Sequence, residues 1–160
     1  MDLDRLSTGE KIAAASGVLL FVFTFLDWFK VDLPPGVFSD GGANAWDALS
    51  LIPIVLLLAI VAAVAVAVVR LTDALFEPPI SMNAVVAVLG GLSVLLILYR
   101  IVNPPGEDGV AATGVDVGPA LGIFLGLIAA AGIAYGGYRA MQEEGLSFSD
   151  VADQLSSGRR

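Results

Sequence analysis

The sequence predicts an all-α membrane protein, an antiparallel bundle of four transmembrane helices with short loops and a short C-terminal amphipathic segment. Three observations lead to this fold class. Hydrophobic residues make up 57% of the chain, and the mean hydropathy is +0.86, which is not the make-up of a soluble domain. The apolar residues form four segments near the length of about 20 residues that a spanning helix requires. A diproline pair lies between each segment and the next.

The first two predicted spans follow polar sequences that resemble a helix N-cap. The first span is expected over residues 11–29, behind a Ser-x-x-Glu capping box that begins at Ser7. The second is expected over residues 45–71, where Asn44 and Asp47 have the same spacing. Both patterns indicate that a helix begins within a few residues of the polar pair.

Prolines mark the limits of the other two predicted spans. The third span is expected over residues 81–102, and it ends before Pro104 because proline disfavours helix in the residue that precedes it. The fourth is expected over residues 117–139, with Pro119 in its first turn, where no amide hydrogen bond is lost.

The predicted domains are a transmembrane domain over residues 1–140 and a cytoplasmic tail over residues 141–160. The tail has apolar residues at the i, i+3, i+4 and i+7 positions of a helix. These residues are Phe148, Val151, Ala152 and Leu155. We expect a short amphipathic helix that lies on the inner membrane surface; a frayed tail is the alternative.

Basic residues decide the expected orientation, because cytoplasmic loops carry an excess of lysine and arginine. With four spans both chain ends lie on one side of the membrane. That side holds Arg5, Lys11, Arg70, Arg139, Arg159 and Arg160. The other side holds Lys30 and Arg100. The sequence therefore predicts a multi-pass protein of the plasma membrane with both termini in the cytoplasm.

The residue inventory argues against an enzyme. The chain has no cysteine and no histidine, which excludes thiolate metal sites and His-based catalytic arrangements. No charged residue falls at the centre of a predicted span, where ion-coupled carriers place carboxylates. We expect no catalytic residue, no cofactor and no metal site. The acidic outer loops are expected to form a solvated anionic surface, and weak binding of a divalent cation is the alternative.

Asp27 interrupts the apolar run of the first predicted span. From Ile12 to Asp27 a helix rises about 22 Å, which places Asp27 near the outer boundary of the bilayer and not at its centre. Arg100 reaches the same level from the third span, and Lys30 lies one turn further along the first. We expect an interfacial anchor, either an ion pair of Asp27 with Lys30 or Arg100 or a carboxylate solvated among headgroups. A proton site is the alternative.

The connection between Trp28 and Trp46 carries apolar residues outside the bilayer. Turns are expected at its diproline and at the Gly-Gly pair of residues 41–42. Val37 and Phe38 either belong to a cap over the helix ends or form, with the two tryptophans, an outward contact surface for a partner. The tryptophans are also expected in an aromatic belt at the membrane boundary.

Small residues recur at four-residue spacing in the fourth predicted span. This ridge consists of Gly118, Gly122, Gly126, Ala130 and Ala134. Ala87 and Gly91 have the same spacing in the third span. Such ridges let helix backbones approach closely in a membrane. We expect packing within the bundle, and a homo-oligomer seam is the alternative.

Five stretches carry a resemblance to known proteins. GEKIA, FLDWF, NAWDAL, RIVNPPG and GVDVGPALGIFLGLIAAAGIAYGGYRAMQEEG together resemble a group of small four-helix actinobacterial membrane proteins. The resemblance covers most of the chain, and it implies a bacterial protein of this topology without an assigned activity. The architecture is also loosely similar to that of claudins, although the claudin cysteine pair and Gly-Leu-Trp run are missing.

These observations favour a non-enzymatic structural or interaction subunit of the plasma membrane. Its expected partners are the lipid bilayer and either a second copy of the chain or another membrane protein. The net charge of −8 argues against nucleic acid. The alternative is a small transporter or channel component formed by oligomerisation. A polar path through the bundle would favour that alternative, whereas a closed apolar core would favour the first interpretation.

Overall fold

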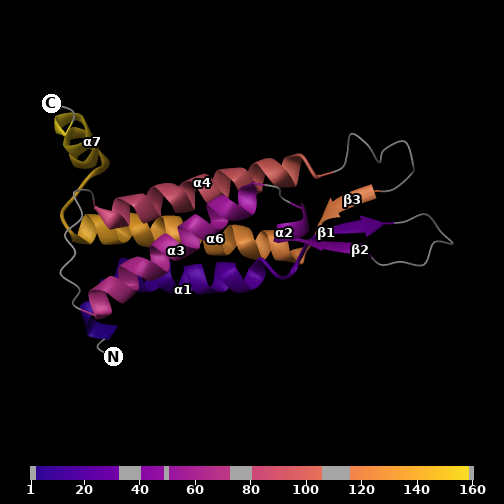
Figure 1. The fold of residues 1–160 in the computed structure, drawn as a ribbon, viewed down its shortest axis with the longest axis horizontal. Helices are drawn as coiled ribbons and strands as arrows, with labels where there is room; N and C mark the ends of the chain where they lie inside the picture. Colours follow the sequence, from indigo (N-terminus) through magenta and orange to yellow (C-terminus); the bar gives the residue numbers. More distant parts are fainter. Residues whose placement is uncertain (1–2, 33–40, 49–50, 73–80, 106–115, 159–160) are drawn as a thin grey trace.

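Four long helices lie side by side in the computed structural model, with a small sheet at one end of the bundle (Figure 1). The structure describes residues 3–32, 41–48, 51–72, 81–105 and 116–158. The long helices are α1 (Thr8–Phe23), α3 (Ile52–Leu71), α4 (Met82–Val102) and α6 (Leu121–Glu143). They alternate in direction, so both chain ends lie opposite the sheet (Figure 1). We call these two ends of the bundle the terminal end and the sheet end.

The four helices pack as a ring in which α6 contacts α1 and α4, and α3 contacts the same two helices. The first predicted span therefore packs against both the second and the fourth. Large side chains fill the centre, among them the fully buried Leu20, Leu56, Ile97 and Ile133. Of the helices that the structure describes, α3, α4 and α6 are long and apolar enough to cross a membrane. The described part of the chain is thus mostly helical, with three candidate membrane spans.

The predicted end of the first span was wrong. Helix α1 ends at Phe23, and Asp27–Asp32 forms strand β1 in place of a further helical turn. Trp28 and Phe29 are both buried, although neighbours in a regular strand face opposite sides. The register shift between Asp27 and Phe29 explains this, because a bulge at Trp28 lets both aromatic rings face inward.

A three-stranded sheet corrects the all-α prediction. Strands β2 (Gly41–Asn44) and β3 (Asp116–Pro119) both pair antiparallel to β1, in the order β2-β1-β3. The glycine pair of residues 41–42, predicted as a turn, lies within β2. Pro119 lies in β3 and not in the first turn of α6. An edge strand tolerates proline, because it does not need every amide for pairing.

The second predicted span is divided. Helix α2 (Ala45–Ala48) is separate from α3, which begins at Ile52 with Pro53 in its first turn. Proline has no amide hydrogen to continue a helix from the preceding residues, so it favours a new start at this point. The predicted cap of the second span is present on α2, since Asn44 Oδ1 accepts hydrogen bonds from the amides of Trp46 and Asp47.

Helix α7 (Phe148–Ser157) confirms the predicted amphipathic segment of the tail. It turns away from the bundle axis at the terminal end (Figure 1). Val151 is buried against the bundle, and the ring of Phe148 stacks on Tyr138 with centroids 5.9 Å apart. The Ser147 hydroxyl and amide, which cap the helix, hold the pKa of the exposed Asp150 carboxyl below its ordinary value of 3.8. This cap therefore stabilises α7 fully above that value and is lost as the pH falls through the lowered pKa.

Candidate functional site: a buried polar cluster at the terminal end

Glu10 is the one charged residue that is buried in the described part of the chain, with 4% of its surface exposed. The predicted capping box fixes its position in the first turn of α1. The Ser7 hydroxyl accepts from the Glu10 amide at 3.2 Å, and the Ser7 amide donates to Glu10 Oε2 at 3.0 Å. This box holds the carboxylate close to the bundle axis and leaves Oε1 for residues of other helices.

Three further side chains meet Glu10 at the terminal end. Arg70 comes from the last turn of α3, Asn83 from the first turn of α4, and Glu144 caps the C-terminus of α6. Arg70 Nε donates to Glu10 Oε1 at 3.1 Å, and Asn83 Nδ2 donates to the same oxygen at 3.2 Å. We call Glu10, Arg70, Asn83 and Glu144 the polar cluster.

Glu144 completes the polar cluster as a second carboxylate. Asn83 Nδ2 donates to Glu144 Oε1 at 3.0 Å, and Arg70 Nη2 contacts the same oxygen. The Ser81 hydroxyl donates to Glu144 Oε2 at 3.1 Å. Helices α1, α3 and α4 thus each supply one member, and the fourth member, Glu144, is the C-cap of α6. The guanidinium of Arg70 bridges two carboxylates, a use to which its planar set of donors is suited.

The polar cluster acts as a structural tie. Every oxygen of its two carboxylates accepts at least one hydrogen bond, so the burial of Glu10 is compensated. Arg70 remains half exposed, at 49% of its side chain, which lets water screen part of the interaction. Within the described residues no group of three or more His, Cys, Asp or Glu could hold a metal ion. The hydrogen bonds of the polar cluster join the ends of α1, α3, α4 and α6.

Trp28 closes the opposite end of the bundle. Its indole Nε1 donates to the carbonyl of Phe23 at 2.7 Å, and its ring is fully buried. A Cβ on Gly126 would lie 2.6 Å from Trp28 Cζ2, and one on Gly122 would lie 2.9 Å from Trp28 Cδ1. The ring therefore packs directly on the backbone of α6. The sequence predicted Trp28 in an aromatic belt at the membrane boundary. This prediction was wrong, because the ring is buried inside the bundle.

The predicted anchor residues lie at the sheet end but are not joined. Asp27 and Lys30 are exposed, and the Asp27 carboxylate lies over the backbone of Gly42. No ion pair within 4.0 Å connects Asp27 with Lys30 or Arg100 among the described residues. Arg100 instead donates to the carbonyls of Ala48 and Asn103 at 3.2 and 3.4 Å. It lies at the C-terminal ends of α2 and α4, where a cation is favoured.

The predicted contact surface of the first long loop is only partly visible. Val37 and Phe38 lie outside the described residues. Trp46 is 39% exposed, and its ring lies 6.3 Å from that of Phe25. The described parts of this loop form β1 and β2, and the side chain of Trp28 in β1 is buried against the bundle. This arrangement is the one expected of a cap over the helix ends. The alternative of an outward surface at Val37 and Phe38 stays a prediction.

The predicted glycine ridge faces the interior over most of its length. Gly122 and Gly126 contact Trp28, Ala130 is fully buried, and the amide of Ala134 would lie 2.5 Å from a Cβ on Gly90. Gly118 lies in β3 with open space beside it. In α4 the close approach is made by Gly90, and not by Gly91, where a Cβ would meet nothing within 4 Å.

Most of the polar cluster was missed at the level of sequence. Glu10 was recognised as part of a capping box, and Arg70 as a topogenic charge. Neither Asn83 nor Glu144 was singled out. The alternating direction of the helices was a sequence signal that could have found them. It places the N-termini of α1 and α4 and the C-termini of α3 and α6 together at the terminal end of the bundle. Polar residues at those four positions are candidates for mutual contact.

Comparison with known proteins gives no further guide to the cluster. No protein-family model, no curated protein and no solved structure matches the chain.

Proposed function

We propose that this chain is an integral membrane protein of the bacterial plasma membrane in which α1, α3, α4 and α6 all cross the bilayer. Three of these helices meet the length and hydropathy of a span. Helix α1 has 16 residues, or about 24 Å. Turn hydrogen bonds of Phe25 to Val22 and of Leu26 to Phe23 extend it toward the thickness of the hydrocarbon core.

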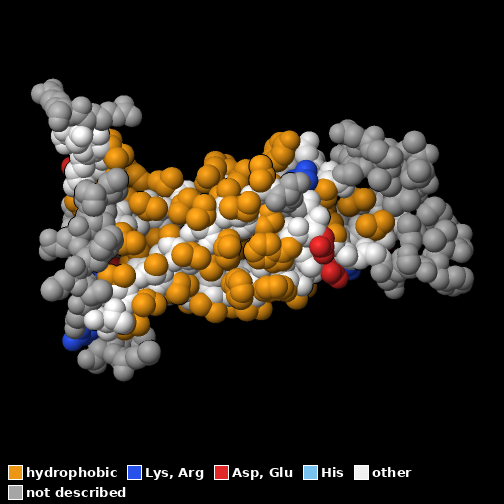
Figure 2. All heavy atoms as spheres, viewed as in Figure 1, with side chains coloured by type: hydrophobic (Ala, Val, Ile, Leu, Met, Phe, Trp, Pro, Cys, Tyr) orange, Lys and Arg blue, Asp and Glu red, His pale blue; other side chains and the backbone are white. Residues whose placement is uncertain are grey.

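The apolar surface of the bundle supports this proposal. Figure 2 shows hydrophobic side chains along the length of the helices, with charged side chains toward the two ends. Exposed large hydrophobic residues occur on all four helices, for example Val18, Leu58, Leu95 and Ile128. A soluble protein rarely exposes so continuous an apolar surface. Helix α1 carries this surface as the other three do, which favours a fourth span.

The distribution of basic residues supports cytoplasmic termini. Arg5, Lys11, Arg70 and Arg139 lie in elements at the terminal end, whereas Lys30 and Arg100 lie at the sheet end. The larger number of basic residues at the terminal end fits the inner face of the membrane, because lysine and arginine, and not the net charge, set the orientation. In this orientation the sheet lies outside the cell and α7 lies at the inner surface.

The observation that carries the functional proposal is a closed apolar core. Four polar or charged residues are buried in the described part of the chain: Glu10, Thr24, Asn83 and Ser93. Glu10 and Asn83 belong to the terminal end, and Thr24 to the sheet end. Ser93 alone lies between them, and its hydroxyl donates to Leu89 of its own helix at 2.8 Å.

A core of this kind offers no hydrated path, so we infer a non-enzymatic structural or interaction subunit. It would act through its two ends and its lipid-facing surface, on a second copy of the chain or another membrane protein. The alternative, a transporter or channel component, would require a path along the outside of the bundle between copies.

Reconstituted vesicles test this function. We expect proton and potassium flux across vesicles that contain the protein to equal the flux across protein-free vesicles, with an added ionophore as the positive control. Ser93 is the one fully buried polar side chain between the two ends of the bundle in the described residues, so leucine at this position removes the polar group that a path through the core could use. Flux that rises with protein content and disappears in Ser93→Leu would contradict the closed core and support the transport alternative.

A further inference from the structure

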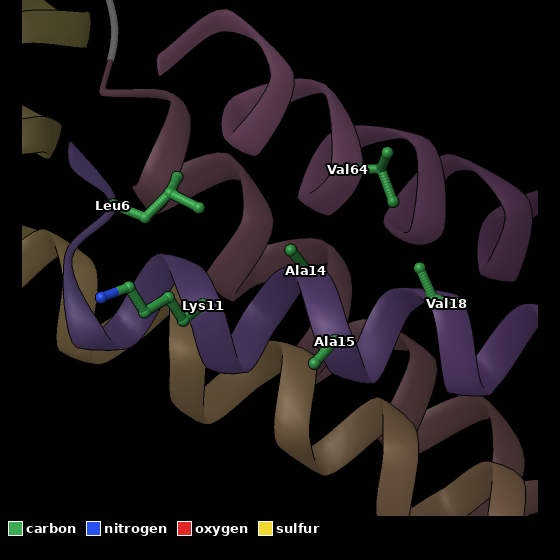
Figure 3. Close-up of a pocket in the computed structure, with 6 residues that line it drawn as sticks. All are labelled: Leu6, Lys11, Ala14, Ala15, Val18 and Val64. Carbon is green, nitrogen blue, oxygen red and sulfur yellow. The ribbon is translucent and has the colours of Figure 1, made fainter. Parts of the chain in front are cut away.

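An apolar groove runs along the outside of the bundle between α1 and α3. It encloses about 530 Å³ and is lined by Leu6, Lys11, Ala14, Ala15, Val18 and Val64 (Figure 3). The hollow exists because two successive residues of α1, Ala14 and Ala15, have short side chains beside the larger Leu6, Val18 and Val64. Its volume lies within the range of about 300–1,000 Å³ that small-molecule sites occupy.

Lys11 gives the groove one charged end. Its side chain extends toward the terminal end of α1 (Figure 3) and is exposed. In the described part of the chain no hydrogen bond or ion pair occupies its ammonium group. The neighbouring carboxylate of Glu10 does not neutralise it, because both Glu10 oxygens are turned into the polar cluster and bonded to Ser7, Arg70 and Asn83.

The groove thus combines an apolar trough with a cation at its end that has no ion-pair partner among the described residues. If α1 and α3 cross the bilayer, the trough lies in the hydrocarbon layer and the ammonium group reaches the level of the headgroups. The complementary ligand has a long apolar chain and an anionic head. A zwitterionic lipid fits less well, because its own cation competes with Lys11 for the phosphate.

We propose that this groove binds one acyl chain of an anionic phospholipid, with the headgroup phosphate paired to Lys11. The proposal rests on the membrane embedding proposed above. One lysine near a charged lipid surface contributes about 1 kcal/mol, which corresponds to roughly a fivefold preference for the anionic lipid.

Retention of lipid by the purified full chain tests the proposal. The protein is equilibrated in mixed micelles with equal amounts of phosphatidylglycerol and phosphatidylcholine, and bound lipid is counted by native mass spectrometry. We expect the wild type to retain phosphatidylglycerol about fivefold over phosphatidylcholine. Lys11→Gln should remove this preference and leave a lipid bound. Ala14→Leu should fill the trough and remove one bound lipid of either kind.

Lys30→Gln is the matched control, because it removes the same charge at the sheet end, and it should keep the wild-type preference. Ala15→Leu replaces Ala14→Leu if the latter lowers the thermal stability. An unchanged preference in Lys11→Gln, or an unchanged lipid count in the folded leucine variants, would overturn the proposal. Extraction of the wild type from membranes by alkaline carbonate would instead contradict the embedding itself, so the two failures are distinguishable.

Discussion

Replacement of Glu10 by alanine is expected to lower the free energy of unfolding by about 2–4 kcal/mol. The change removes the acceptor of Arg70 Nε and of Asn83 Nδ2, and it breaks the capping box with Ser7. Loss of one partner of a fully buried ion pair costs about 3–5 kcal/mol. The half exposure of Arg70 reduces this figure, because water can solvate the released guanidinium.

Unfolding in mixed micelles measures this effect, and Asp153→Asn is the control. Asp153 lies on the exposed side of α7, so its neutralisation changes the net charge without touching the polar cluster. A double-mutant cycle of Glu10→Gln and Arg70→Gln should show a coupling of about 0.5–3 kcal/mol. If Glu10→Ala were as stable as Asp153→Asn, the polar cluster would not tie the helices together.

Replacement of Gly136 by alanine is expected to destabilise the bundle by about 1–3 kcal/mol, although alanine is the better helix former. A Cβ at this position would lie 2.5 Å from the amide nitrogen of Ala13 and 2.7 Å from the carbonyl oxygen of Gly9. Both atoms belong to the backbone of α1, so no side chain can rotate to make room. Helices α1 and α6 would have to move apart and lose the packing between them.

Gly91→Ala provides the same substitution at a site in α4 where a Cβ would meet nothing within 4 Å. We expect this variant to match the wild type or to gain up to about 1 kcal/mol, because alanine restricts the unfolded chain more than glycine does. Thermal unfolding of both variants in the same detergent decides the matter. Equal stability of Gly136→Ala and Gly91→Ala would show that the close approach of α1 and α6 is not required.

The helices could be predicted from the sequence because each signal was local. Ser7 and Glu10 have the spacing of a capping box, and that box is formed. The third span was expected over residues 81–102, and α4 occupies Met82–Val102. The helical spacing of the apolar residues in the tail predicted a helix, and α7 occupies Phe148–Ser157. In each case the hydrogen bonds that set the element run between residues three or four apart.

The sheet could not be predicted from apolar length alone. Trp28 and Phe29 continue the apolar run of the first span, and a run of this kind does not separate helix from buried strand. What ends α1 is pairing with β2 and β3, which come from distant parts of the chain. The alternation of Phe29, Lys30, Val31 and Asp32 was a weak strand signal that the apolar run obscured.

The polar cluster depended on contacts between helices that are far apart in sequence. Arg70 is 60 residues from Glu10, and Asn83 is 73 residues from it. Helix direction alone places them at the same end. It does not give the rotation of each helix, and therefore not which polar side chains face inward. The unknown rotation of α4 also explains why Gly91 was expected at the helix contact. The structure places Gly90 there, against the backbone of Ala134 in α6.

Labelling of single cysteines tests most directly whether four helices cross the membrane. The chain has no cysteine, so Asp4→Cys, Asp32→Cys and Ser157→Cys each introduce one thiol at an exposed position. In intact cells an impermeant maleimide should label position 32 and should label positions 4 and 157 only after permeabilisation. Labelling of positions 4 and 32 on the same side of the membrane would show that α1 does not cross it and would contradict the four-span bundle.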